Sequence, residues 1–123
     1  MKRALIILDH GSRRAEAHAH LAGIADSVRS RAPELCVYLA HLELAAPSLA
    51  EAVDRAVAAG ATHIAIHPFF LAPGRHLLED IPELVAAAET KHGGVQIELL
   101  TPIGEDEALA DLIVASLGEP PEA

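Results

Sequence analysis

The stretch Ala4-Leu5-Ile6-Ile7-Leu8, followed at once by Asp9-His10-Gly11-Ser12, decides the fold predicted for this chain. An unbroken apolar run of this length is typical of a parallel strand that is buried on both faces of a sheet. Gly11-Ser12 ends the strand, and apolar side chains then recur at helical spacing from about residue 14 to residue 31. A buried strand, a short polar loop and an amphipathic helix form the first part of a βαβ unit.

The same alternation of short apolar runs and longer amphipathic ones continues along the chain. We predict strands over residues 36–44, 63–70 and 95–99, and helices over about 48–59, 80–92 and 105–117. The last strand alternates apolar and polar residues, which favours a half-exposed edge strand. Ser48 and Asp80 each stand three residues before a glutamate, which is the spacing of a helix-capping box.

This pattern predicts an α/β fold: a four-stranded parallel sheet flanked by helices on both faces, with right-handed crossovers. In a flavodoxin-like order the first and third strands are neighbours, and ligands bind beyond the carboxyl ends of the strands. The site is therefore expected in the segments after Leu8, Leu42 and Phe70. Residues 1–118 are expected to form a single domain, and residues 119–123 a disordered tail.

The composition of the 123 residues excludes several classes of protein. A net charge of −9 and an aromatic content of 2% do not suit nucleic-acid binding, which needs a basic face and rings for stacking. Cys36 is the only cysteine, so the chain has neither a disulfide framework nor a thiolate metal cage. The N-terminal apolar run is too short for a signal peptide or a membrane span, so we expect a soluble, cytoplasmic protein.

Imidazole and carboxylate side chains follow the carboxyl ends of the first three predicted strands. His10 follows the first strand, His41 and Glu43 lie near the end of the second, and His76 follows the third. In the absence of thiolates, these groups suit borderline divalent ions such as Co²⁺, Ni²⁺ and Fe²⁺. His41 and Glu43 lie two residues apart on a strand, so they are expected to share a face, from which both would be able to approach one ion.

Each of these residues also has an interpretation that involves no metal. A lone histidine at a strand end is more often a surface or hydrogen-bonded residue than a ligand, and capping of a neighbouring helix is an alternative role for Glu43. His18, His20 and His92 are interpreted as helix-surface residues.

Three arginines, Arg13, Arg14 and Arg75, cluster at the same edge of the predicted sheet in an otherwise acidic protein. They are either ordinary solvated charges or bidentate partners for the carboxylates of a substrate. Gly11-Ser12, at the start of the first helix, adds backbone N–H groups that suit an anion. This edge of the sheet is thus a candidate site for an anionic substrate as well as for a metal.

Three segments together resemble the CbiX/SirB class of tetrapyrrole chelatases. They are Leu8 to Arg13, which contains the HGSR box; Leu42-Glu43-Leu44 with Pro47-Ser48; and Pro68 to His76 with Asp80-Ile81-Pro82. The likeness covers nearly the whole chain. The HGSR box alone is a weak signal, but its combination with the later segments is a specific one.

The resemblance implies that the chain inserts Co²⁺, Fe²⁺ or Ni²⁺ into sirohydrochlorin, in cobalamin or siroheme biosynthesis, without a permanently bound cofactor. It implies that His10 binds the metal and accepts a proton, that His76 is a second ligand, and that Glu43 assists the metal. Short members of this class pair as homodimers whose cleft both subunits line. The residues expected to contact the tetrapyrrole are Ser12, Arg13, Ala46, Leu71, Ala72, Pro73, Gly74 and Arg75.

The chain departs from the pattern of the class at Asp9, where a small residue is usual, at Ala46, and at His67. Two other functions are weighed against chelation. One is phosphoryl transfer with His10 as nucleophile, which a preceding Asp9 would oppose by repelling phosphate. The other is a metal-binding or metal-delivery module without catalysis, which would leave the three arginines without a role.

Overall fold

The computed structural model describes residues 2–72 and 74–121, with the side chains of all of these except His76, Leu77 and Leu78. Four strands form one parallel sheet in the order β2-β1-β3-β4. The strands are β1 (Arg3–Asp9), β2 (Cys36–His41), β3 (His63–Pro68) and β4 (Gln96–Leu99). The first and third strands are neighbours, so the predicted parallel sheet and its flavodoxin-like order are confirmed.

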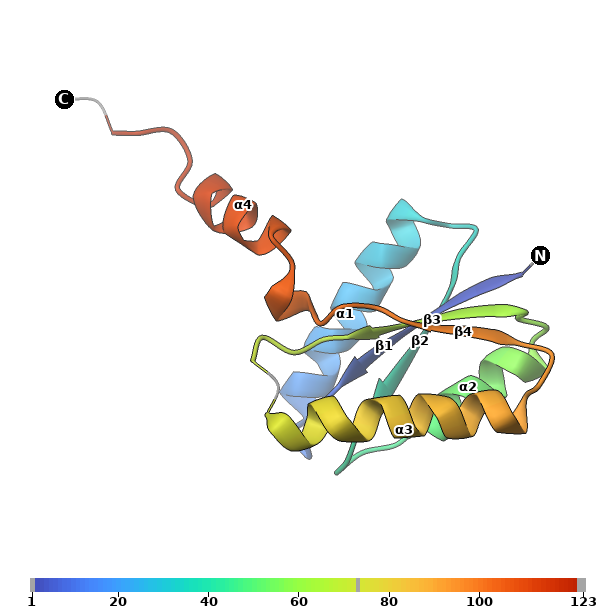
Figure 1. Cartoon of the computed structure of the whole chain (residues 1–123). Coiled ribbons are helices and arrows are strands. Elements are labelled where there is room, and N and C mark those ends of the chain that lie inside the picture. The colour runs from blue at the N-terminus through green and yellow to red at the C-terminus, as the bar shows by residue number, and fades with distance from the viewer. Residues whose placement is uncertain (1, 73, 122–123) are drawn as a thin grey trace.

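Helices cover both faces of this sheet (Figure 1). One face is covered by α1 (Ala15–Arg31), and the other by α2 (Leu49–Ala58) and α3 (Arg75–Lys91). After β4, a short 3₁₀ turn η1 (Ile103–Glu105) leads to α4 (Ala108–Ala115), which projects away from the sheet (Figure 1). The prediction that helices flank the sheet is therefore right for α1, α2 and α3. It is wrong for α4, which covers neither face.

Alternate residues of the central strands supply two separate cores. Ile6, Leu8, Ile64 and Ile66 are fully buried and point toward α2 and α3, where the larger core lies. Ile7 and Val37 point to the opposite face and pack against Leu21 and Ala25 of α1. Successive side chains of a strand face opposite ways, so β1 can serve both cores at once.

The second helix begins as the capping-box spacing predicts. The Oγ atom of Ser48 accepts a hydrogen bond from the backbone N–H of Glu51 at 3.1 Å, and Oε1 of Glu51 accepts one from the N–H of Ser48 at 3.1 Å. The same spacing at Asp80 predicted the third helix wrongly, because α3 begins five residues earlier, after Gly74. Pro82 therefore lies inside the helix, where it removes one backbone hydrogen bond without ending it.

Two further boundaries differ from the prediction. β2 ends at His41 and not at residue 44, and Leu44 has a φ of 68°, in the left-handed region that no strand residue adopts. The last helix begins at Ala108, where the carboxylate of Asp106 accepts a hydrogen bond from the Ala108 N–H at 2.8 Å. A capping carboxylate at Asp106 thus places the helix start later than apolar spacing alone suggested.

None of the described helices is long and apolar enough to cross a membrane. Residues 119–121 are exposed and form neither helix nor strand, while residues 122 and 123 lie outside the described part of the chain. The disordered tail and the domain boundary at residue 118 stay predictions.

Asp54 on α2 joins this helix to the C-terminal end of α3. Its Oδ1 atom lies 2.7 Å from Nε2 of His92, and its Oδ2 atom accepts a hydrogen bond from Nζ of Lys91 at 2.9 Å. The hydrogen bond from His92, and after it the one from Lys91, hold the pKa of Asp54 below its ordinary value of 3.8. The ionised carboxylate is thus favoured in the folded protein.

We expect Asp54→Asn to lower the free energy of unfolding at pH 7. A depressed pKa contributes stability above the ordinary pKa and loses it as pH falls through the folded value, so the gap to wild type should narrow below about pH 4. Urea unfolding at several pH values measures this. Asp26→Asn, which removes an exposed pair with Arg29, is the control and should change little. A gap of constant size at all pH values would contradict the role given to the charge.

Candidate functional site

A cleft of about 1100 Å³ opens at the carboxyl ends of the first three strands. Its walls are the loop after β1 (Asp9 to Ser12), Leu42 and Glu43 after β2, and Phe69 to Ala72 after β3, with parts of α1 and α3. The volume exceeds the upper end of the usual range for drug-sized ligands, about 1,000 Å³. The topology therefore places the cleft where the sequence predicted it, and its size suits a large ligand.

The structure brings together two of the predicted metal ligands in this cleft. Nε2 of His10 lies 2.6 Å from Oε1 of Glu43, and the two side chains are 54% and 59% exposed. An ionised carboxylate only accepts hydrogen bonds, so in this contact Nε2 carries the proton. An imidazole and a carboxylate at this distance can exchange that proton for a metal ion.

The backbone around this pair continues the pairing of β1 with β2 beyond the last strand residues. The N–H of Leu42 donates to the carbonyl of Asp9 at 3.0 Å, and the N–H of Glu43 to the carbonyl of His10 at 3.1 Å. Gly11 makes the approach possible: its φ is 106°, and a Cβ atom there would lie 1.7 Å from the carbonyl oxygen of Glu43. Only glycine fits at this position.

His41 and Glu43 do not share a face of the second strand as predicted. The side chain of His41 is only 6% exposed, and Nδ1 lies 2.6 Å from Oδ1 of Asp9, its neighbour in the sheet. Because β2 ends at His41, the chain turns before Glu43, and the two side chains have different partners. The expected shared face was wrong because it assumed a strand that continued to residue 44.

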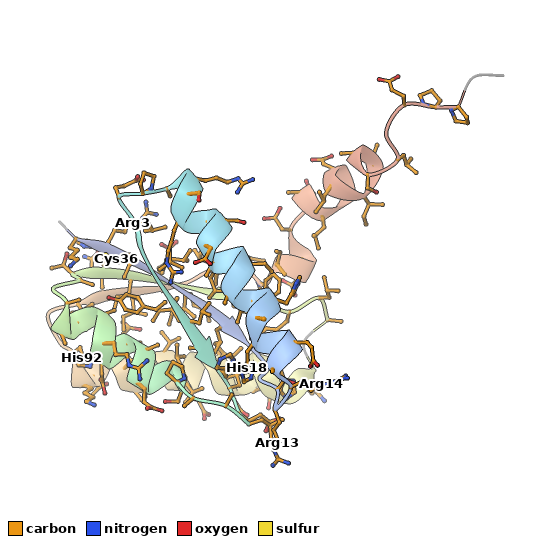
Figure 2. The ribbon with its side chains drawn as sticks, turned by 180° about the vertical axis from the view of Figure 1, so that it is seen from behind. Arg3, Arg13, Arg14, His18, Cys36 and His92 are labelled. Atoms are coloured by element: carbon orange, nitrogen blue, oxygen red, sulfur yellow. The ribbon has the colours of Figure 1, made fainter. Side chains whose placement is uncertain are left out.

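Two of the histidines interpreted as helix-surface residues have defined partners instead. His18 is half-buried, stacks on the ring of His41 with centroids 5.2 Å apart, and is hydrogen-bonded through Nε2 to the carbonyl of Ser12. His92 is bonded to Asp54 at the opposite end of the molecule (Figure 2). The third, His20, is exposed, but it lines the cleft.

Sequence reasoning thus missed His20, and it also missed Asp80 and Glu83 of α3 as cleft residues. The pattern in the sequence that could have identified these cleft residues is helical spacing. His20 lies three residues after Ala17, which also lines the cleft, and Asp80 and Glu83 are three residues apart on α3. One stripe of each helix therefore faces the cleft.

The residues expected to contact a substrate are divided between the cleft and its surroundings. Ser12, Leu71, Ala72 and Gly74 line the cleft. Arg13, Ala46 and Arg75 are exposed outside its lining, with Arg13 pointing outward from the start of α1 (Figure 2). Pro73 lies outside the described residues, as does the side chain of His76 in the first turn of α3.

The charge of the cleft is negative where it is described. Four carboxylate residues line it, Asp9, Glu43, Asp80 and Glu83, and no lysine or arginine is among the described lining residues. Within the part of the chain whose side chains are described, no three His, Cys, Asp or Glu residues cluster closely enough to hold a metal ion. Among these side chains, His10 and Glu43 form a pair that attracts a cation without enclosing it.

His67 on β3 does not line the cleft. Burial lowers its pKa, and the carboxylate of Asp106 opposes the shift. The neutral imidazole is thus favoured on a half-buried part of the sheet. Cys36, at the start of β2, lies at the far end of the strand from the cleft (Figure 2).

The segment after β4 supports one wall of the cleft. The N–H of Gly104 donates to the carbonyl of Phe70 at 2.9 Å. A Cβ atom at Gly104 would lie 1.7 Å from the carbonyl oxygen of Leu71, so the 3₁₀ turn lies directly against the loop that carries Leu71 and Ala72. Glycine at this position lets two segments of backbone touch behind the cleft wall.

Comparison with known proteins extends the resemblance noted in the sequence. The sequence profile of the CbiX family matches residues 4–119. The chain is 38% identical over 109 residues to the chloroplastic sirohydrochlorin ferrochelatase of Arabidopsis thaliana. The aligned region covers 89% of this chain and 48% of that protein. It is 30% identical to the sirohydrochlorin cobaltochelatase of Methanosarcina barkeri, over 96% of each chain. The chain thus spans about half of the plant relative and nearly all of the Methanosarcina one.

Solved structures agree with this comparison. The crystal structure of a cobalamin biosynthesis CbiX protein from Marinobacter aquaeolei superimposes with a TM-score of 0.80 at 34% identity, covering 94% of this chain and 93% of that one. The sirohydrochlorin chelatase SirB from Bacillus subtilis in complex with cobalt gives a TM-score of 0.81 at 30% identity, over 95% of this chain and 50% of that one.

We expect Gly11→Ala to destabilise the protein more than Gly60→Ala does. Both glycines have positive φ, 106° and 97°, so alanine at either costs about 1–2 kcal/mol in backbone conformation. A Cβ atom at Gly60 meets nothing closer than Lys2 Cδ at 3.7 Å, whereas one at Gly11 collides with the Glu43 carbonyl. Thermal and urea unfolding of the two variants measure the difference. Equal losses would show that the close approach at Gly11 relaxes at no cost.

Proposed function

Because the chain belongs to the CbiX family, we propose that it is a chelatase that inserts a divalent metal ion into a sirohydrochlorin-type tetrapyrrole. The observation that carries this proposal is the contact between His10 Nε2 and Glu43 Oε1, 2.6 Å apart in a cleft large enough for a macrocycle. Relatives that are 38% and 30% identical to the chain are named sirohydrochlorin ferrochelatase and sirohydrochlorin cobaltochelatase.

The reaction exchanges one divalent ion for two pyrrole protons, and the described pair suits both halves of this exchange. An ion held by both side chains would separate the nitrogen and oxygen to roughly 3 Å, because each ligand lies about 2.0–2.2 Å from such an ion. Both side chains are more than half exposed, so they are free to move apart. Once the ion has passed to the macrocycle, the imidazole and the carboxylate are again able to accept protons. A ligand set this small releases its metal, unlike a closed four-ligand site.

The remaining cleft residues divide the tasks of binding. Apolar side chains of Leu42, Phe69, Leu71 and Leu84 offer a surface for the face of a macrocycle. The four carboxylates attract the ion. Carboxylates at the edge of the tetrapyrrole would meet Arg13, Arg14 and Arg75, which lie outside the lining and are exposed.

The ligand chemistry supports Co²⁺ and Fe²⁺ as metal substrates, and Ni²⁺ as a third, because imidazole and carboxylate suit all three. Bacillus SirB has been solved with cobalt and with Fe³⁺. Cobalamin and siroheme synthesis are the corresponding pathways. A cytoplasmic location stays a prediction, and the Arabidopsis relative is named as chloroplastic. Each metal is tested by incubating the protein with sirohydrochlorin and one ion, and following the absorbance change on metalation.

The charge of the cleft argues against one of the two other functions weighed from the sequence, and turnover tests the other. Phosphoryl transfer at His10 needs cations around the phosphate, but the described lining offers carboxylates, among them Asp9 and Glu43. A metal-delivery module would bind the ion without accelerating metalation, so turnover of sirohydrochlorin distinguishes it from a chelatase.

We expect His10→Ala to slow metalation by about 100-fold or more, because it removes both a ligand and a proton acceptor. His76→Ala is expected to act similarly. Glu43→Gln should slow the reaction less, since the amide keeps an oxygen ligand but loses the charge. The control is His63→Ala, which removes a half-buried histidine that does not line the cleft. Wild-type rates in His10→Ala, measured by absorbance, would remove this residue from the mechanism.

We propose further that the active species is a homodimer, and the exposed surface of α4 supports this. Leu112, Ile113 and Val114 of α4 are 63%, 67% and 66% exposed, and Leu117, two residues after its end, is 78% exposed. An isolated helix of 8 residues is unstable in water, so α4 requires a surface on which to pack. A second copy of the chain provides one, and it would also enlarge the cleft wall, since α4 follows the turn that supports Leu71.

We expect Ile113→Asp to shift the protein from dimer to monomer and to lower its specific activity on dilution, because the charge prevents burial of α4. Ala86→Asp adds the same charge at an exposed position of α3 and should leave the dimer intact. Sedimentation at assay concentration gives the mass. A wild-type monomer with full specific activity at every dilution would contradict the homodimer.

A further inference from the structure

Behind the His10–Glu43 pair lies a second group of side chains, the rear histidine cluster, formed by Asp9, His41 and His18. His41 is 5% exposed, and its Nδ1 atom lies 2.6 Å from Oδ1 of Asp9. His18 of α1 stacks on the His41 ring at an interplanar angle of 28°. His41 and His18 are absent from the lining of the cleft. The reaction as proposed therefore does not use these two imidazoles.

The cluster holds both segments that carry the metal pair. Asp9 directly precedes His10, and His41 stands two residues before Glu43. Asp9 and His41 are sheet partners on the last rung between β1 and β2, so their hydrogen bond ties the two strand ends together. Only the backbone bonds of Leu42 and Glu43 lie between this rung and the His10–Glu43 contact.

His18 holds the other end of the loop that carries His10. Its Nε2 atom is hydrogen-bonded to the carbonyl of Ser12, two residues after His10. The carbonyl can only accept, so Nε2 of His18 donates. The N-cap residue of α1, Arg14, makes no side-chain capping bond. The loop is thus held at Asp9 by His41 and at Ser12 by His18.

We propose that His41 and His18 are positioning residues that keep His10 and Glu43 at ligating distance, an inference that rests on the proposed function. With both strand ends held, only the two exposed side chains need to move when an ion enters, and the backbone does not. Partners hydrogen-bonded directly to metal ligands are worth typically 10–100-fold in metal affinity or activity. His41 and His18 act one step further out, on the backbone that carries the ligands, so an effect near the lower end of this range is expected. Asp9, His41 and His18 thus set the affinity of the pair for the ion.

The experiment measures Co²⁺ binding by the protein without tetrapyrrole, by titration and by the visible absorption of bound Co²⁺. His41→Leu removes the bond to Asp9, and we expect about tenfold weaker binding with a changed spectrum. His41→Asn should restore binding to near wild type. The amide nitrogen of asparagine stands as many bonds from the backbone as Nδ1 does, so it can still donate to Asp9. In turnover, His41→Leu should lower kcat and leave the KM for sirohydrochlorin unchanged.

His92→Leu is the matched control. It breaks a similar histidine–aspartate pair, 2.7 Å long and 17% exposed at the histidine, between α2 and α3. It should lower thermal stability without changing Co²⁺ affinity. His18→Phe keeps a ring against His41 but loses the bond to Ser12, and should weaken Co²⁺ binding by a smaller factor. This variant serves as the test if His41→Leu does not fold.

Wild-type Co²⁺ affinity and spectrum in folded His41→Leu and in His18→Phe would overturn the positioning role and leave the cluster structural. Failure to regain binding in folded His41→Asn would likewise contradict the role given to the Asp9 bond. His10→Ala separates this inference from the proposed function. If His10→Ala binds Co²⁺ normally, the proposed site itself is wrong. If His10→Ala loses Co²⁺ while the His41 and His18 variants keep it, only the positioning role fails.

Discussion

The carbonyl oxygen of Glu43 occupies the space that a side chain at position 11 would need. The contact requires glycine at position 11, and with glycine there the loops after β1 and β2 can run side by side beyond the end of the ladder. The backbone bonds from Leu42 to Asp9 and from Glu43 to His10 follow from it. The separation of 2.6 Å between His10 Nε2 and Glu43 Oε1 also follows from this approach, because neither side chain has to reach across a gap. The chemistry of the cleft thus depends on the absence of one Cβ atom.

Two histidine–carboxylate pairs lie within a few residues of each other, one joining the ends of β1 and β2 and one joining the loops that follow them, and their surroundings give them opposite properties. The pair of His41 and Asp9 is expensive to break at the aspartate, since removing Asp9 leaves the imidazole of His41, only 6% exposed, without water or a replacement bond. The pair of His10 and Glu43 is more than half exposed, so water can replace either partner. Exposure therefore distinguishes the pair proposed to exchange its proton for a metal ion from the pair that joins the two strand ends.

Most of the architecture could be predicted because it depends on patterns that repeat. The unbroken apolar run at Ala4–Leu8 predicted a buried central strand, and topology alone placed the cleft at its carboxyl end. The end of β2 could not be predicted, because the left-handed φ of Leu44 has no signal in a non-glycine residue. The start of α3 was placed at Asp80, where the capping spacing is present but lies inside a longer helix.

The candidate site was predictable in its chemistry more than in its contacts. His10 and Glu43 could be named because reactive side chains at strand ends meet at one edge of a parallel sheet. The role of His18 could not, because its partners, Ser12 and the ring of His41, are brought to it only by the packing of α1 on the sheet. Sequence spacing gives no indication of a stacking contact between residues 23 positions apart in the chain.

The turn at Gly104 makes the cleft a product of the whole chain. Its backbone touches that of Leu71, so the cleft wall formed by the loop after β3 packs against a segment that follows the last strand. A shortened chain ending at β4 would contain every strand and every described side chain of the cleft. Its β3–α3 loop, however, would lose the packing contact with Gly104. The sheet and the site therefore need different minimal lengths of chain. The sheet is complete at Leu99, and the site only some residues later.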